Sequence, residues 1–166
     1  MANNYTQFSE ALDVETDEQK AWLVDWLSPP SAGLLDPENE EALAKWAKRR
    51  GAEAGDAESW PSFDWSFSGE KNYRNEETAP WSLWLHADEG CITDNVANTV
   101  QAFFKQFKID STFTLTWAET CSSLRVGEFS GGGFIVMPLG KSVKWSTPYM
   151  LFDWVHKQLE KKKGKQ

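Results

Sequence analysis

Residues 112–138 read TFTLTWAETCSSLRVGEFSGGGFIVMP, and they contain two strands that decide the fold. Large apolar residues alternate with threonines over residues 112–118, and this period of two indicates a half-buried strand. Residues 133–138 are apolar on both faces, which indicates a central strand. The segment between them is predicted to be a hairpin loop, and its length exceeds the usual span of about two to five residues. That excess length is a reason to look for function there.

Further periodic segments lie on both sides of this strand pair. They are strands at 62–68, 81–87 and 142–146, a helix at 93–107 with Thr93 as its N-cap, and a last helix that begins at Thr147-Pro148. Short turns between successive strands imply an antiparallel sheet. Residues 60–166 are therefore predicted to form an α+β domain of order ββαβββα, with a mainly antiparallel sheet and helices packed on one face.

Residues 1–50 are predicted to form a helical segment in front of that domain. Thr16 and Gln19 make a capping box for a helix whose apolar stripe is Trp22, Leu23, Trp26 and Leu27. Residues 5–12 are predicted as a short helix before it, because Phe8 and Leu12 lie four positions apart.

A second helix of this segment begins at Asp36-Pro37. The basic residues 48–50 lie at its C-terminal end, where the helix dipole favours cations. Residues 51–59, GAEAGDAES, are predicted to be an acidic linker to the α+β domain.

Charge is distributed unevenly along the chain. Residues 1–90 carry a net charge of −12 and residues 91–166 carry +4, which together give the formal charge of −8. The acidic half argues against nucleic-acid binding, because it would repel phosphates. It suits either a basic protein partner or simply a solvated surface.

The cysteine count and the hydropathy favour a cytoplasmic protein with reduced thiols. Cys91 and Cys121 make no disulfide framework, and the first residues show no signal-peptide pattern. No stretch approaches the roughly 20 apolar residues of a membrane span. Ten tryptophans exceed what a core of this size needs, so some are expected to contact a partner.

The glycines at 131–133 do not predict a phosphate-binding loop. Such loops lead into a helix N-terminus, whereas a strand follows here. Glycines before a strand favour a bulge or a close approach of two backbones.

No credible catalytic set or metal site emerges from the sequence. Cys121 would need a histidine as its base, and a set of Cys121, His86 and Glu119 is conceivable without support from spacing. A zinc site would require Cys91, Cys121, His86 and His156 to converge from four separate elements. We therefore expect a protein without enzymatic activity, cofactor or metal.

A ligand-binding role remains open for the loop between the two strands. Arg125 could grip a carboxylate or phosphate through its planar fork, or pair internally with Glu119 or Glu128. Trp84 and Phe129 could stack on a planar, nucleotide-like ligand. The candidate binding residues are Trp84, His86, Glu119, Cys121, Arg125, Glu128 and Phe129.

The string from Trp117 to Gly133 resembles a segment of small proteins encoded by bacteriophages and mobile elements. These proteins carry the pattern W-A-x-T-C-S-x-x-R-x-G-E-F-x-G-G-G, followed by an apolar strand. The resemblance covers residues 60–146. It implies a phage or plasmid setting but no particular reaction.

Three hypotheses follow from these observations. The first is a non-enzymatic interaction protein of a phage or mobile element, which binds a host protein, such as a defence component, through an acidic surface rich in tryptophan. The second is a binder of a small nucleotide-like ligand at the 117–133 loop. The third is a hydrolase that depends on Cys121 or on Glu119 and Glu128. An exposed patch of Trp22, Trp26 and Trp46 would favour the first.

Overall fold

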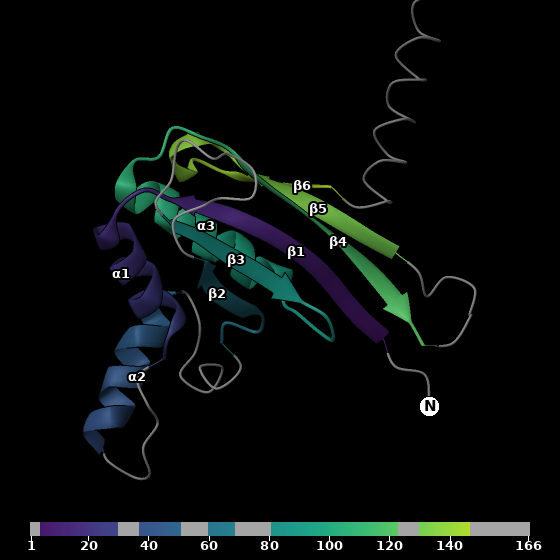
Figure 1. Cartoon of the computed structure of the whole chain (residues 1–166). Coiled ribbons are helices and arrows are strands. Elements are labelled where there is room, and N and C mark those ends of the chain that lie inside the picture. Colours follow the sequence, from purple (N-terminus) through teal and green to yellow (C-terminus); the bar gives the residue numbers. More distant parts are fainter. Residues whose placement is uncertain (1–3, 30–36, 51–59, 69–80, 123–129, 147–166) are drawn as a thin grey trace, which may run out of the picture.

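The computed structural model of the chain describes residues 4–29, 37–50, 60–68, 81–122 and 130–146 (Figure 1). Its elements are β1 (Asn4–Val14), α1 (Asp17–Leu27), α2 (Pro37–Arg49), β2 (Asp64–Ser68), β3 (Trp81–Ala87), α3 (Thr93–Phe107), β4 (Phe113–Cys121), β5 (Ser130–Val136), the short 3-10 helix η2 (Pro138–Gly140) and β6 (Val143–Ser146). The α+β class predicted from the sequence is confirmed.

The described strands form a single six-stranded sheet of order β2-β3-β1-β4-β5-β6. Every neighbouring pair runs antiparallel, as predicted. β1 lies in the middle: it pairs with β3 over residues 8–14 and with β4 over residues 4–7. The first strand of the chain thus joins two hairpin-like halves that come later in the sequence.

The predicted helix at residues 5–12 is wrong, because this segment is the central strand β1. Phe8 and Leu12 do share a buried face, but positions four apart lie on the same face of a strand as well as of a helix. Residues 1–50 therefore contribute a strand to the sheet and are not a purely helical preface. From residue 60 onward the described strands and α-helix follow the order ββαβββ, and β1, α1 and α2 precede them.

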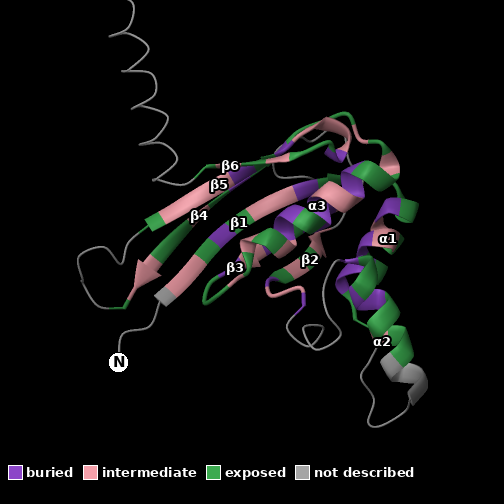
Figure 2. Ribbon diagram, turned by 180° about the vertical axis from the view of Figure 1, so that it is seen from behind, coloured by how far each residue is buried: buried purple, intermediate pink, exposed green. Residues whose placement is uncertain are grey.

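Helix α3 covers one face of the sheet, which we call the inner face (Figure 2). Its apolar stripe meets the inward side chains of β1, β3, β4 and β5 in one core. The fully buried members include Val96, Val100 and Phe103 from α3 and Leu85, Leu115 and Phe134 from the strands. Alternation along β4 places its threonines on the opposite, outer face.

The capping box that starts α1 is confirmed, since the Thr16 side chain accepts a hydrogen bond from the backbone N–H of Gln19. Trp22 of α1 stacks on Trp26 with ring centroids 4.8 Å apart, and it also contacts Phe103 of α3. The apolar stripe of α1 thus packs against the core and does not form an exposed surface patch.

Arg50 joins α1 to α2. Its guanidinium lies 3.7 Å from the ring centroid of Trp46 and 4.6 Å from that of Trp26. It donates hydrogen bonds to the backbone carbonyls of Trp26, Trp46 and Asp25 at 2.6–2.7 Å. The sequence predicted that the basic residues at the end of α2 interact with the helix dipole. Arg50 is only 4% exposed and belongs to the core.

The remaining boundaries agree closely with the sequence in some places and shift in others. β3 and α3 begin and end where predicted, although the N-cap of α3 is Ile92 and not Thr93. β4 continues to Cys121 and β5 starts at Ser130, so the connection between them is shorter than predicted. The predicted linker at 51–59 and the last helix after Thr147 fall outside the described residues.

Candidate functional site

The outer face of the sheet carries small side chains around one exposed indole. Trp84 of β3 is 45% exposed, and its strand neighbours are Ala11 of β1 and Ser66 of β2. The alternation along β3 predicted that Trp84 would point to this face, and its exposure confirms that. An exposed large apolar residue on a surface of serines and alanines is the informative exception.

The indole of Trp84 is held from two sides. Its Nε1 donates a hydrogen bond to the Ser9 hydroxyl at 2.9 Å, which links β3 to β1. Its ring stacks on the imidazole of His86 with centroids 3.8 Å apart and planes 25° apart. The orientation of Trp84 is therefore set before any partner binds, which lowers the entropy cost of binding.

A groove of about 400 Å³ runs beside Trp84 on the outer face. It is lined by Ser9, Glu10, Ala11, Ser66, Ser68, Ser82 and Trp84. Small side chains let another surface approach the strands closely, and the indole forms one wall. Among the described residues, none of these lining groups is a cation.

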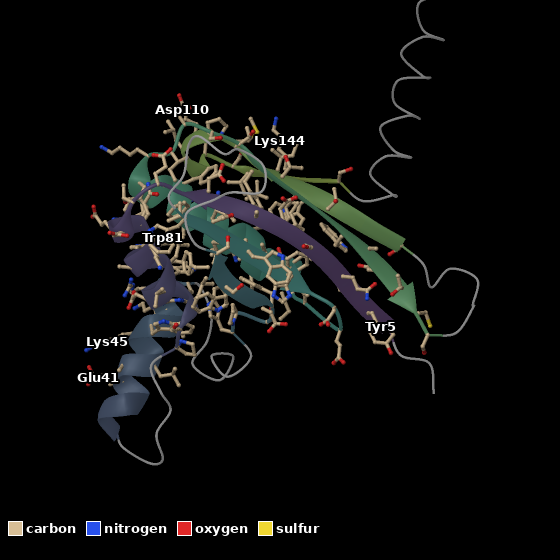
Figure 3. The ribbon with its side chains drawn as sticks, viewed as in Figure 1. Tyr5, Glu41, Lys45, Trp81, Asp110 and Lys144 are labelled. Atoms are coloured by element: carbon tan, nitrogen blue, oxygen red, sulfur yellow. The ribbon has the colours of Figure 1, made fainter. Side chains whose placement is uncertain are left out.

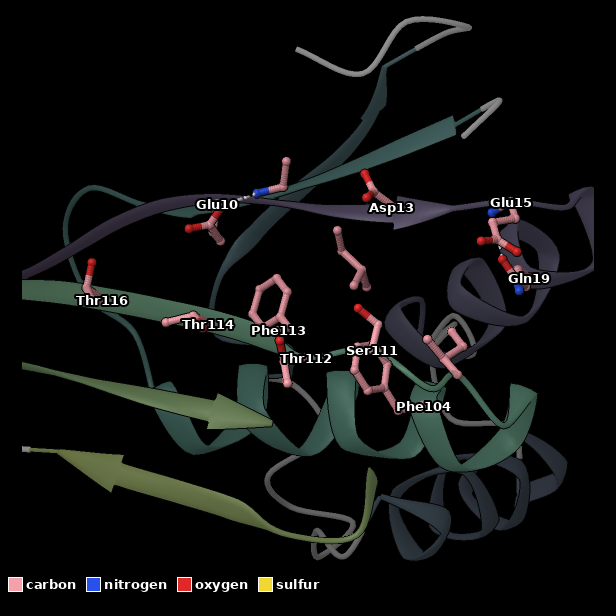
Figure 4. A pocket seen from close by; sticks show the side chains of 13 residues that line it. Glu10, Asp13, Glu15, Gln19, Phe104, Ser111, Thr112, Phe113, Thr114 and Thr116 are labelled. Atoms are coloured by element: carbon pink, nitrogen blue, oxygen red, sulfur yellow. Dashed lines mark hydrogen bonds between the residues drawn. The ribbon is translucent and has the colours of Figure 1, made fainter. Parts of the chain in front are cut away.

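A second cavity, which we call the β1–β4 gap, opens where these two strands separate (Figure 4). Their pairing runs only to Gln7 opposite Ala118, and beyond that point each strand pairs on its other side alone. The gap has a volume of about 360 Å³ and is bordered by Glu10, Asp13 and Glu15. Hydroxyls of residues 111, 112, 114 and 116 lie along the β4 side.

The β1–β4 gap could not be predicted from the sequence. No feature of the sequence at residues 112–116 indicates whether this part of β4 pairs with β1 or separates from it. The one signal is Glu10, a charged residue between Phe8 and Leu12 on an otherwise buried strand face. Its Oε1 accepts a hydrogen bond from the backbone N–H of Ala11 at 3.0 Å.

The predicted site residues do not gather in one place. Trp84 and His86 lie on the outer face, whereas the alternation along β4 directs Glu119 and Cys121 to the inner face. His86 is opposite Ser9 and Cys121 is opposite Asn4, so about 16 Å of β1 separates them. His86 therefore lies out of hydrogen-bonding reach of Cys121, and the hypothetical catalytic set is not assembled.

Glu119 is engaged at the end of the β4–β5 hairpin. Its carboxylate accepts hydrogen bonds from the Ser130 hydroxyl and from Nε1 of Trp117. Arg125, Glu128 and Phe129 lie outside the described residues, so the predicted pairing of Arg125 with Glu119 stays a prediction. The same applies to a ligand pocket built from them.

The glycines 131–133 sit within β5 and allow close contact with β4. A Cβ on Gly132 would lie 2.5 Å from the Trp117 ring, which packs over this glycine. A Cβ on Gly133 would lie 2.9 Å from the carbonyl oxygen of Leu115. The predicted close approach of two strands is confirmed, and it accounts for these two glycines without a phosphate.

The thiols and acids of the described part of the chain do not form a metal centre. Within those residues, no group of three or more His, Cys, Asp and Glu side chains is arranged to hold a metal ion. Cys91 is half-buried, and burial raises its pKa to about 12. Its thiol is thus protonated at neutral pH and a poor nucleophile.

Figure 3 shows Glu41 and Lys45 projecting from α2, and Trp81 next to α1. Lys20 of α1 lies 3.2 Å from the Trp81 ring centroid, and Asp17 accepts a hydrogen bond from the indole of Trp81.

Of the helices that the structure describes, none has the length and apolar character to cross a membrane.

Comparison with known proteins identifies no relative of this chain. No protein-family model, curated protein or solved structure matches this chain.

Proposed function

We propose that this chain is a non-enzymatic interaction protein of a phage or mobile element, and that it binds a host protein through the outer face of its sheet. The observation that carries the proposal is the exposed and oriented indole of Trp84. Oriented tryptophans near the centre of a surface commonly dominate the energy of protein interfaces.

The burial of the tryptophans in the helical segment limits where a tryptophan-dependent interface can lie. Trp26 and Trp46 are 7% and 4% exposed, and Trp22 packs against the core. The helical segment therefore offers no tryptophan patch of the kind that would have favoured binding there. Trp84 is the one tryptophan among the exposed large apolar residues of the described chain.

The charge of the surroundings supports a basic partner. The groove beside Trp84 is bordered by Glu10 and lacks a described cation. The first 90 residues have a net charge of −12, which would steer a positively charged protein toward this half. The lack of an assembled catalytic set in the described residues makes a hydrolase the weaker hypothesis.

Affinity capture with matched variants tests the proposal. The immobilised full chain, Trp84→Ala and Ile92→Ala would each be exposed to host lysate, and retained proteins would be quantified by mass spectrometry. Ile92 is 51% exposed, is the N-cap residue of α3 and does not line the groove beside Trp84, so its substitution controls for general loss of apolar surface. The proposal predicts a protein that the wild type and Ile92→Ala retain and that Trp84→Ala loses. If Trp84→Ala retains the same proteins as the wild type, the proposal is contradicted.

A further inference from the structure

We propose that the β1–β4 gap binds an extended, uncharged segment of the partner protein, which adds to the unpaired edge of β4 as a further strand through backbone hydrogen bonds. The inference rests on the proposed function only in taking the segment to come from a protein. The gap adjoins the Trp84 groove, because Glu10 and Ala11 line both. One partner can therefore contact the indole and the strand edge together.

The first argument concerns the backbone groups of β4 that face the gap. The carbonyl oxygen of Leu115 points toward β5, since a Cβ added to Gly133 of β5 would lie 2.9 Å from it. Backbone groups of successive strand residues point to opposite sides, so those of Thr114 and Thr116 point toward β1. Pairing with β1 stops at Ala118, and no other described strand lies on that side of β4.

Thr114 and Thr116 therefore present backbone donors and acceptors to the gap. Extended peptides can add to such an edge as a further strand. The β1 side is less receptive, because the backbone N–H of Ala11 already donates a hydrogen bond to the Glu10 carboxylate. We therefore assign the pairing to β4, with the added strand antiparallel to it, as every described neighbour in this sheet is.

The second argument concerns a buried amide at one end of the gap. Gln19 is only 7% exposed and lines the gap beside Glu15 (Figure 4). Its Oε1 accepts a hydrogen bond from the backbone N–H of Glu15 at 2.7 Å, and its Nε2 donates to no described residue. A largely buried donor without a partner is unfavourable, so a ligand that supplies an acceptor gains affinity. A backbone carbonyl of an extended segment is such an acceptor.

The third argument concerns charge. Glu10 and Asp13 already have interactions within the chain, so they do not require a cation from a ligand. Together with Glu15, they place negative charge beside the gap, which disfavours an acidic segment. No Lys, Arg or His is among the residues that line the gap. An uncharged segment fits these surroundings best.

The floor and the size of the gap also suit an extended segment. Phe104 and Phe113 line its inner end, and both are buried. Alternate side chains of a strand point to opposite faces, so apolar ones can face these rings while small polar ones lie beside Thr114 and Thr116. A volume of about 360 Å³ lies in the usual range for binding pockets, roughly 300–1,000 Å³.

A defined peptide tests this inference without knowledge of the partner. The probe is a short acetylated and amidated peptide in which Thr alternates with Val, titrated into the isotope-labelled full chain while amide NMR shifts and hydrogen exchange are followed. The matched control peptide has the same side chains and N-methyl groups on its backbone amides. We expect the probe to slow exchange of the Thr114 and Thr116 amides and to leave that of Leu115 unchanged. The control peptide should not bind, and affinity for the probe should not fall as salt rises.

A variant of Gln19 provides the second arm. Gln19→Glu keeps an acceptor for the Glu15 N–H at a position where helix N-termini favour Glu, but it removes the Nε2 donor. It should lower the affinity for the probe about fivefold. Asn98→Asp adds the same charge at an exposed position of α3 that does not line the gap, and it should leave the affinity unchanged.

Several results would overturn the inference. They are unchanged exchange of the Thr114 and Thr116 amides, equal binding of the N-methylated peptide, and equal effects of Gln19→Glu and Asn98→Asp. Tighter binding of a peptide with Lys in place of Thr would likewise contradict an uncharged occupant.

The outcome is separable from that of the proposed function. Trp84→Ala should still bind the probe peptide in the gap, although it should lose the captured host protein. If the peptide binds as expected and no host protein depends on Trp84, the gap assignment holds and the proposed function fails. If capture depends on Trp84 and the peptide does not bind the gap, the reverse is true.

Discussion

Nε1 of Trp84 donates a hydrogen bond to the hydroxyl of Ser9 at 2.9 Å, across the pairing of β3 with β1. The two residues are 75 positions apart in the sequence. This bond connects the exposed indole, on which the proposed interface depends, to β1. The same strand borders the β1–β4 gap. Its role is to orient the indole, because both groups are exposed and the bond itself adds little stability.

Removal of the Ser9 hydroxyl should therefore affect binding more than folding. We expect Ser9→Ala to change the free energy of unfolding by less than about 1 kcal/mol. The indole N–H resonance of Trp84 should broaden or shift as the ring gains freedom, and partner affinity should fall. Ser142→Ala removes an exposed hydroxyl that does not line the groove, and it serves as the control. An unaltered indole resonance would show that Ser9 does not orient the ring.

Arg50 should be the most sensitive cation of the described chain. Arg50→Met removes the donor of two buried hydrogen bonds to backbone carbonyls and of a third, part-buried one, and it removes the cation beside two indoles. Urea unfolding should therefore report a loss of about 3 kcal/mol or more. Arg49→Met removes only an exposed pair with Asp25 and should cost less than about 1 kcal/mol. Equal losses for the two variants would contradict the buried role of Arg50.

Two glycines form a matched pair for the β4–β5 contact. A Cβ at Gly132 would lie 2.5 Å from the Trp117 ring and 2.9 Å from the Ser146 carbonyl oxygen, so Gly132→Ala should destabilise the fold by about 1–3 kcal/mol. Nothing lies within 4 Å of the corresponding point at Gly90, and Gly90→Ala should be neutral within about 0.5 kcal/mol. Thermal unfolding of both variants measures the difference. A neutral Gly132→Ala would mean that Trp117 does not pack there.

Cys91 should make stability depend on pH in the alkaline range. Burial raises the pKa of its thiol from 9.0 to about 12, so the folded chain keeps a proton that the unfolded chain loses. The stabilising contribution is fully present below about pH 9 and is lost as the pH rises toward 12. The stability advantage of the wild type over Cys91→Ala, measured by urea unfolding, should shrink from pH 9 to pH 11. A constant advantage would indicate that the thiol ionises freely in the fold.

The sequence predicted those elements whose periodicity is unambiguous. The alternation along β3 and β4 and the broad stripe of α3 each fit one period only, and their positions agree with the structure. β1 was missed because Phe8 and Leu12 fit both periods, and because Glu10 interrupts the buried face. Its identity as a strand is decided by pairing with β3 and β4, which are distant in sequence.

The candidate site was predictable only in part, for the same reason. Trp84 follows from alternation along one strand, whereas its contacts with Ser9 and His86 depend on which strands become neighbours. The β1–β4 gap depends on where two strands stop pairing, and the buried position of Arg50 depends on the packing of α2 against α1. None of these has a local sequence signal.

Trp84→Ala tests the central claim most directly. The purified host protein identified by capture would be titrated by calorimetry into the wild type, Trp84→Ala and Ile92→Ala, after unfolding curves show that all three fold alike. The account predicts that Trp84→Ala weakens binding by at least about 30-fold, as for a dominant interface residue, while Ile92→Ala matches the wild type. Equal affinity for wild type and Trp84→Ala would contradict the proposal that the outer face of the sheet is the binding surface.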